Sequence, residues 1–333
     1  GLVNTKPSLL LEPQSTNLIE NSSFQGVGTG IAPNLWGTFD PNFSSAGQDE
    51  LNGFKIRFAA TVARGYLYRT ITVSSQTYAL SFYTHEVTTG ILISDVAAIY
   101  GVTRSIDGYF ENGINVGNII IQSNKRYTLV FTVSSGTSAT IRLGGGVNAN
   151  STFDFVLSKP QLEQLSYATS YIPTNGSTQT RAAETCNGAG TSSILPSEEG
   201  ILYAEIAALS DSITTSVFSI SNGSSANTLY MGFPNTTNVI QAQLVVGGAA
   251  QTNMNHTVSD RTSFNKVAVL FRNNNHKMFI GGLEVETDTS GSTPSAGTFD
   301  RINFDLGQGS FDFYGKIRDI RVYNTKEMTD SEV

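Results

Sequence analysis

The residues best suited to chemistry are Glu284, Glu286 and Asp288, three carboxylates at every second position of one short segment. Residues two apart in a β-strand point to the same face, so this spacing would gather acidic side chains as glycoside hydrolysis requires. A Gly-Gly pair precedes the segment and a Ser-Gly-Ser run follows it, which predicts a short solvated hairpin strand. Charge on such a strand protects a sheet edge from further pairing. We therefore predict no catalytic residue and interpret the chain as non-enzymatic.

Metal chemistry is not favoured by the other candidates. His85, His256 and His276 lie far apart with no pair at zinc-ligand spacing, and Cys186 is the single cysteine. No metal site and no cofactor are therefore predicted. Calcium takes oxygen ligands from scattered loops, so a structural calcium ion stays open as an alternative. Its candidate ligands near expected loop or strand ends are Asp40, Asp49, Glu50 and Asp154.

Aromatic residues are the stronger indication of a binding site. Exposed rings stack on the apolar faces of sugars, and neighbouring amide and carboxyl groups add hydrogen bonds. Aromatic residues make up 10% of the chain, so most of them belong to a core. Further aromatic candidates in the first half are Tyr66 and Tyr68. The predicted glycan-binding residues are Trp36, Tyr83, Tyr109 and Phe110, with Trp36 and Tyr109 favoured.

Composition limits the classes of partner. The chain has 333 residues, with 20 Lys and Arg against 27 Asp and Glu, and its net charge is −7. Because no basic cluster is present, neither nucleic acid nor an anionic membrane is an expected partner. Charged residues are only 14% of the chain, which predicts a neutral, polar surface. No apolar run reaches the roughly 20 residues of a membrane-spanning helix, so no membrane insertion is expected.

The elements that position these residues are β-strands. Apolar residues alternate with period two in almost every structured segment, and helical spacing is absent. Short strands rich in Thr and aromatics, separated by Gly, Ser and Asn, are typical of sandwiches. We predict an all-β chain of two tandem antiparallel β-sandwiches (jelly rolls). The expected strands are 54–58, 66–73, 78–83, 127–133, 140–143 and 153–157, then 200–206, 217–220, 228–233, 240–246, 266–271, 277–280 and 315–323.

The length of the chain allows two domains, each with its own core. The segment 187–197 is small, polar and rich in Gly and Ser, which is typical of a linker. We therefore predict a first domain at 1–186, a linker at 187–197 and a second domain at 198–333.

Two motifs frame the first domain. They are PSLLLEPQSTNLI at 7–19 and QLEQLSYATSYIPT at 161–174, the latter leading into TRAAE at 180–184. Together they resemble a module of tailed-bacteriophage structural proteins that frames a jelly roll similar to carbohydrate-binding modules. The resemblance implies a carbohydrate-binding-module-like jelly roll at 1–186.

The ending GKIRDIRVYNTKEMTDSE at 315–332 resembles that of concanavalin-A-like or laminin-G-like sandwiches, which often follow the module in phage fibre and appendage proteins. Together with the framing motifs it covers most of the chain. Glycoside hydrolases of the concanavalin-A-like group carry a catalytic Glu, Asp, Glu triplet. The Glu, Glu, Asp order at 284–288 departs from it.

These resemblances imply a non-enzymatic surface protein of a phage virion, either a tail or head fibre or a capsid decoration protein, located outside the cell. The implied partners are other virion proteins and glycans of host or environmental surfaces, bound weakly and strengthened by many copies. A homo-oligomer is expected, with a trimer favoured. Two alternatives stay open: a polysaccharide-degrading virion enzyme with a cleft in the second sandwich, and a structural spacer without a ligand.

Overall fold

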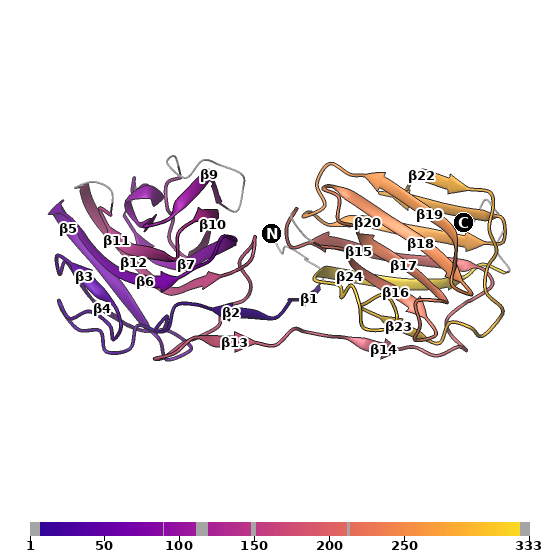
Figure 1. Cartoon of the computed structure of the whole chain (residues 1–333), viewed down its shortest axis with the longest axis horizontal. Helices are drawn as coiled ribbons and strands as arrows, with labels where there is room; N and C mark the ends of the chain where they lie inside the picture. Colours follow the sequence, from indigo (N-terminus) through magenta and orange to yellow (C-terminus); the bar gives the residue numbers. More distant parts are fainter. Residues whose placement is uncertain (1–6, 89, 111–118, 148–150, 212–213, 327–333) are drawn as a thin grey trace, which may run out of the picture. The chain divides into compact units, whose positions relative to one another are not determined.

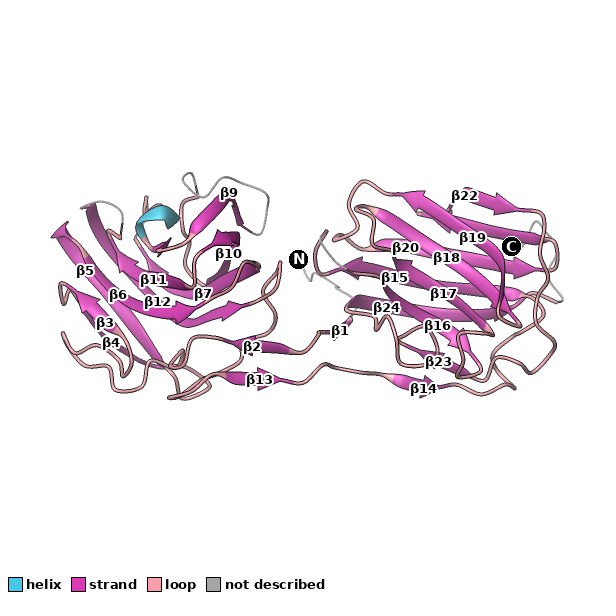
Figure 2. Cartoon of the chain, in the orientation of Figure 1, coloured by secondary structure: helices cyan, strands magenta, loops and turns pink. Residues whose placement is uncertain are grey.

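The computed structural model describes residues 7–88, 90–110, 119–147, 151–211 and 214–326. Within them the chain is made of strands, with a single short 3-10 helix, η1 at Ile93–Asp95 (Figure 2). The strand pairs of the named sheets are antiparallel, which confirms the prediction of an all-β chain of antiparallel sandwiches. In the described part of the chain, no helix has the length and apolar character needed to cross a bilayer.

The chain divides into two compact units. The first, which we call the N-terminal unit, is Gln14–Ala182. The second, the C-terminal unit, joins Gly1–Pro13 to Ala183–Val333. These boundaries differ from the predicted 1–186, 187–197 and 198–333, because short strands outside the predicted second domain pair with its sheets.

Two sheets share one core in the N-terminal unit (Figure 1). The six-stranded sheet has the order β4-β5-β12-β7-β10-β9, and the four-stranded sheet has the order β3-β6-β11-β8. Inward-pointing residues of both sheets, among them Phe58, Phe82, Ile99 and Ile141, are fully buried. The strands of this unit are β2 (Ser15–Asn17), β3 (Gly37–Phe39), β4 (Phe43–Gln48), β5 (Phe54–Ala63), β6 (Gly65–Thr72), β7 (Thr77–Val87), β8 (Ala97–Tyr100), β9 (Thr103–Phe110), β10 (Lys125–Ser135), β11 (Ser138–Gly145), β12 (Ser151–Glu163) and β13 (Gln179–Arg181).

The two framing motifs of the sequence meet in a buried polar network beside the pair β2 and β13. The Nδ2 atom of Asn17 donates to the carbonyl of Ile172 over 2.9 Å, and its Oδ1 accepts from the N–H of Leu162 over 3.2 Å. Glu163, fully buried, accepts a hydrogen bond of 2.7 Å from Ser15 Oγ. Buried polar groups stabilise a fold only when they are partnered, as these are. The framing motifs therefore close the N-terminal unit.

Two six-stranded sheets form the C-terminal unit. Their orders are β1-β24-β15-β20-β21-β22 and β14-β23-β16-β17-β18-β19. Phe218, Leu229, Phe271 and Met278 are fully buried in the core between them. The strands are β1 (Leu9–Leu11), β14 (Asn187–Ala189), β15 (Gly200–Ala208), β16 (Ser216–Ser221), β17 (Thr228–Phe233), β18 (Val239–Val246), β19 (Ala249–Thr257), β20 (Asn265–Arg272), β21 (Asn275–Ile280), β22 (Leu283–Asp288), β23 (Arg301–Asn303) and β24 (Gly315–Asn324).

Two short strands account for the shifted boundaries. Strand β1 pairs with β24, and Leu11 at its end joins the core with 4% of its surface exposed. Strand β14 lies within the predicted linker and pairs with β23. There Asn187 Nδ2 donates to Asp305 Oδ2 over 2.9 Å. The hydrogen bonds of β14 thus hold this segment as a strand, although its polar, Gly-rich composition predicts a flexible linker.

Candidate functional site

The outer surface of the four-stranded sheet brings aromatic residues of three strands together. Register places Phe39 of β3 opposite Tyr66 of β6, and Gly37 of β3 opposite Tyr68. On the other side of β6, Arg142 of β11 stands opposite Tyr68. Directly opposed residues of antiparallel strands point to the same side of a sheet, and the residues between them point to the core. We call the surface formed by Phe39, Tyr66, Tyr68, Tyr100 and Arg142 the aromatic face.

A parallel ring pair forms one end of the aromatic face. The ring centroids of Phe39 and Tyr66 are 5.1 Å apart, and their planes differ by 6°. Tyr66 is 5% exposed, whereas Phe39 is 45% exposed. The outer ring therefore covers the inner one and presents its own apolar surface to solvent.

Tyr68 lies flat in the centre of the aromatic face. Its ring occupies the space above Gly37, where any side chain would meet it. The ring is nevertheless 40% exposed, so the side that does not rest on β3 is open to solvent. A flat, half-exposed tyrosine of this kind combines an apolar surface with a hydroxyl group that can form hydrogen bonds.

Arg142 connects the rings of neighbouring strands. Its guanidinium carbon lies 5.1 Å from the ring centroid of Tyr66 and 3.8 Å from that of Tyr100 on β8. At these distances the ring quadrupoles attract the cation. In the next row, Thr70 Oγ1 and Thr140 Oγ1 are 2.9 Å apart. The aromatic face thus offers ring surfaces, a cation and hydroxyl groups on one hydrogen-bonded sheet.

The prediction of Trp36 as a ligand contact is corrected by the structure. Trp36 is 6% exposed and packs on Phe24, with the ring centroids 5.4 Å apart. Its Nε1–H donates to the carbonyl of Asn21 over 2.8 Å. Both its apolar ring and its polar group are used inside the core, so it has no surface to offer to a glycan.

Tyr83 lies half-buried on β7 of the six-stranded sheet and takes no part in the aromatic face. Two cations contact its ring: the guanidinium carbon of Arg126 at 5.5 Å and Nζ of Lys159 at 5.4 Å from the centroid. Its proposed contact with a ligand stays a prediction.

Tyr109 and Phe110 end strand β9, where they stand opposite Val130 and Leu129 of β10. Their side chains lie outside what the structure describes, so the prediction that they bind a ligand stays open.

Three of the four acidic residues considered as calcium ligands, Asp49, Glu50 and Asp154, contact cations instead. Lys159 has a left-handed backbone with φ of 54°, and its Nζ lies 3.8 Å from Asp49 Oδ2 and pairs with Glu50. Arg57 Nη2 lies 2.6 Å from Asp154 Oδ2. Among the residues that the structure describes, no group of three or more His, Cys, Asp or Glu side chains could hold a metal ion.

The three carboxylates of β22 do not all share one face. The register shifts by one residue within β22: Glu284 pairs with Phe279 and Glu286 pairs with the adjacent Met278, so Val285 is an extra residue that forms a bulge. Glu284 Oε2 lies 2.9 Å from Lys277 Nζ on the partner strand. The bulge therefore interrupts the two-residue periodicity that the sequence pattern implies.

Each inner carboxylate of β22 has a partner. Glu286 Oε1 lies 3.2 Å from His256 Nδ1, and Asp288 Oδ1 accepts from Ser290 N over 2.9 Å. Hydrogen bonds from the Ser290 side chain and backbone hold the pKa of Asp288 below its usual range. A general acid of a glycosidase needs the opposite shift, toward a raised pKa.

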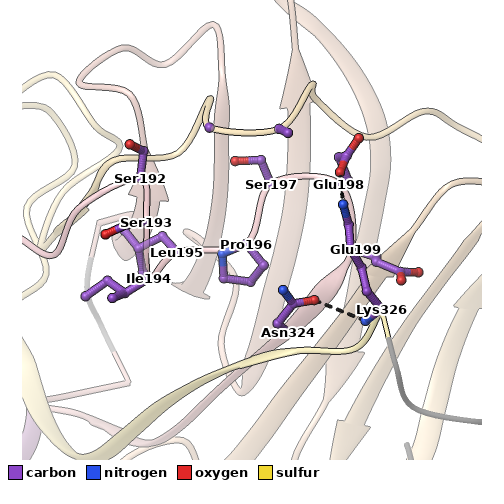
Figure 3. Close-up of a pocket in the computed structure, with 12 residues that line it drawn as sticks. Ser192, Ser193, Ile194, Leu195, Pro196, Ser197, Glu198, Glu199, Asn324 and Lys326 are labelled. Atoms are coloured by element: carbon purple, nitrogen blue, oxygen red, sulfur yellow. Dashed lines mark hydrogen bonds and ion pairs between the residues drawn. The ribbon is translucent and has the colours of Figure 1, made fainter.

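A shallow pocket of about 150 Å³ lies in the C-terminal unit. It is lined by residues 192–199 together with Ala296, Gly297, Asn324 and Lys326. Figure 3 shows Lys326 paired with Glu198 and hydrogen-bonded through its backbone to Asn324. The second glutamate of the pocket, Glu199, pairs with Arg272 at 2.8 Å. Its charged groups are therefore neutralised within the protein, and the pocket lacks an aromatic ring for stacking.

Residues 203–333 match the family model Laminin_G_3, the concanavalin A-like lectin/glucanases superfamily. This match and the two six-stranded sheets define a laminin-G-like, concanavalin A-like sandwich in the C-terminal unit.

Two solved structures are similar to the chain at a low level. Domains LG4-5 of the mouse laminin alpha1 chain match with 12% identity and a TM-score of 0.30, over 78% of this chain and 88% of that one. The full extracellular region of zebrafish Gpr126/Adgrg6 matches with 10% identity and a TM-score of 0.24, over 90% of this chain and 37% of that one. No curated protein matches the sequence.

Proposed function

We propose that this chain is a non-enzymatic, extracellular protein of a phage virion surface that binds glycans through the aromatic face. The observation that carries the glycan-binding part is the exposure of Phe39 and Tyr68, at 45% and 40%, on the outer side of one sheet. Sugar rings present flat patches of C–H groups, and flat aromatic rings are suited to cover them. Thr70 and Thr140 lie beside these rings with hydroxyl groups that suit the hydrogen bonds of a saccharide.

An open sheet surface suits weak, repeated binding. A single ligand on a flat face buries little area, so affinity is low until several copies bind one polymer. This supports the expectation of a homo-oligomer, with a trimer favoured, on a particle that displays many copies.

The virion assignment rests on the framing motifs at 7–19 and 161–174, which resemble those of phage structural proteins. The carbohydrate-binding-module-like character of the N-terminal unit has the same basis, and the other virion proteins are the partners it implies. Antibody labelling of purified virions tests whether the protein lies on a tail or head fibre or decorates the capsid.

The non-enzymatic assignment is supported by the acidic groups. Glu284 is neutralised by Lys277, and Asp288 has a lowered pKa because Ser290 donates hydrogen bonds to it. We therefore expect no release of reducing sugar ends from any polysaccharide that the protein binds.

The decisive experiment is a glycan array probed with multimerised wild-type protein and two variants. Tyr68→Ala removes the central ring of the aromatic face, and Tyr323→Ala removes a tyrosine of similar exposure, 37%, from the C-terminal unit. We expect selective binding that is lost in Tyr68→Ala and retained in Tyr323→Ala. Binding lost only in Tyr323→Ala would move the site to the other unit. Absence of binding to every glycan would favour a structural spacer.

A further inference from the structure

Among the residues that the structure describes, Arg142 is a cation with no anionic partner. Within the described residues no carboxylate lies within ion-pair distance of it, and its N–H groups make no hydrogen bond to another described residue. Most other described arginines form an ion pair with a carboxylate side chain. Examples are Arg57 with Asp154, Arg69 with Glu20, Arg272 with Glu199 and Arg318 with Glu205. The chain has seven more acidic than basic residues, yet within its described part the guanidinium on the aromatic face has no carboxylate beside it.

The position of Arg142 prepares it for an anion. Contacts with the rings of Tyr66 and Tyr100 hold the guanidinium in place. Its five N–H donors form a planar fork. A guanidinium fixed in this way loses little conformational freedom when it forms a further hydrogen bond. The planar, bidentate partner that fits it best is a carboxylate.

Tyr68 stands directly opposite Arg142 in the neighbouring strand. The Tyr68 ring extends over Gly37 of β3, whereas the Arg142 guanidinium lies at the rings of Tyr66 and of Tyr100 on β8. A polysaccharide that crosses these strands can therefore stack one sugar on Tyr68 while the acidic substituent of another sugar of the same polymer reaches Arg142.

We propose that the ligand of the aromatic face is an acidic polysaccharide whose sugar carboxylate binds Arg142 while the same chain stacks on Tyr68 and Phe39. This inference rests on the proposed glycan-binding function and adds the chemical class of the glycan. Arg142 then selects carboxylated sugars, whereas the rings of Tyr68 and Phe39 supply affinity for carboxylated and uncharged sugars alike.

The test compares each polymer with its own uncharged derivative. Polygalacturonate, hyaluronate and polysialic acid are immobilised, each beside the same polymer after reduction of its carboxyl groups to alcohols. We expect wild-type protein to bind at least one carboxylated polymer about tenfold or more tightly than its reduced form. We expect Arg142→Gln to lower that ratio to about one, and Arg142→Lys to retain part of it because the charge remains.

Arg57→Gln is the matched control, because it removes one positive charge from an exposed arginine on the six-stranded sheet of the same unit. Its carboxylate preference should equal that of the wild type. Far-UV circular dichroism and the fluorescence of Trp36 verify that each variant is folded. Equal binding of carboxylated and reduced polymers, or a preference that survives Arg142→Gln, would overturn the role of Arg142 and leave glycan binding intact. Wild-type protein that binds neither form would instead contradict the proposed function itself.

A sulfated polymer distinguishes the type of anion. Dextran sulfate, with its neutral parent dextran, is included in the same assay. Binding that prefers the sulfated polymer over every carboxylated one would contradict the assignment of a carboxylate ligand, whereas weaker binding to it supports that assignment.

Discussion

A Cβ atom on Gly37 would lie 2.3 Å from Cζ of Tyr68, which is far inside contact distance. Because Gly37 has no side chain, the ring of Tyr68 at the centre of the aromatic face can lie flat against β3. Gly37 does not need to contact a ligand to influence binding, because it sets where the ring lies.

We predict that Gly37→Ala displaces the Tyr68 ring and weakens glycan binding about two- to tenfold, the range for losing one aromatic contact. Isothermal titration with the best ligand of the array gives the affinity. The control is the double variant Gly37→Ala/Tyr68→Ala, which should bind no more weakly than Tyr68→Ala alone, since the new methyl group has no ring to displace. Additive losses in the cycle would contradict the mechanism.

Trp36 provides a stability prediction. Trp36→Phe removes the donor to the Asn21 carbonyl and leaves a buried acceptor unpaired, so the free energy of unfolding should fall by about 1–3 kcal/mol. Urea denaturation followed by circular dichroism measures the change. Tyr68→Ala, at an exposed ring, should change stability much less and binding much more. A variant Trp36→Phe that loses binding without losing stability would argue that Trp36 contacts the glycan after all.

Leu11 and Leu9 offer a matched pair within β1. Leu11 is 4% exposed and belongs to the C-terminal core, whereas Leu9 is 41% exposed. Leu11→Ala should cost the C-terminal unit about 2–5 kcal/mol of stability. Leu9→Ala should change stability by no more than about 0.5 kcal/mol.

The fluorescence of the single tryptophan, Trp36, reports the unfolding of the N-terminal unit alone, because Trp36 lies in that unit. In Leu11→Ala the calorimetric transition of the C-terminal unit should move to lower temperature, while the transition seen by Trp36 fluorescence stays in place. Equal shifts for Leu9→Ala and Leu11→Ala would show that β1 does not contribute its inner side chain to the core.

Tyr314 makes stability depend on pH in the alkaline range. Burial and the nearby Asp312 carboxylate, whose Oδ2 accepts from the Tyr314 hydroxyl over 3.1 Å, raise the pKa of Tyr314 from 10.0 to about 12. The folded state therefore holds the phenolic proton more tightly than the unfolded state does. The stabilisation is complete below the unfolded pKa and is lost as pH rises through the folded one.

Urea unfolding at about pH 9 and about pH 11 tests this dependence. Wild-type protein should lose more stability over that interval than Tyr314→Phe, which has no proton to release. An identical pH dependence in the two proteins would contradict a raised pKa at Tyr314.

Regular strands were predictable where alternation is strong, as in the aromatic and β-branched run of β6. Strand β19 is mostly polar, with Thr252 and Met254 buried between Gln and Asn residues, and composition hides its alternation. Strands β1, β2 and β3 have three residues each, too few for any periodic signal. Their pairing depends on partners far along the chain.

Only part of the aromatic face could be predicted from the sequence. The spacing of Tyr66 and Tyr68 indicates two tyrosines on one side of a strand, and this signal was available. Phe39, Tyr100 and Arg142 come from three other strands, so their meeting follows from the register of the sheet, which no local pattern specifies. Trp36 was misassigned for a related reason, because its burial depends on the tertiary position of Asn21.

Strand β1 and strand β24 also constrain how the protein is made. Leu9 pairs with Ile317, about 300 positions later in the chain. At the roughly 5–20 residues per second of ribosomal synthesis, the apolar Leu9–Leu11 segment waits about 15 to 60 seconds for the strand it pairs with. During that interval the N-terminal unit can fold, while β1 has no sheet to join and its leucines remain open to wrong partners. Assembly of the C-terminal sheet thus ends when β24 pairs with a segment that was synthesised about 300 residues earlier.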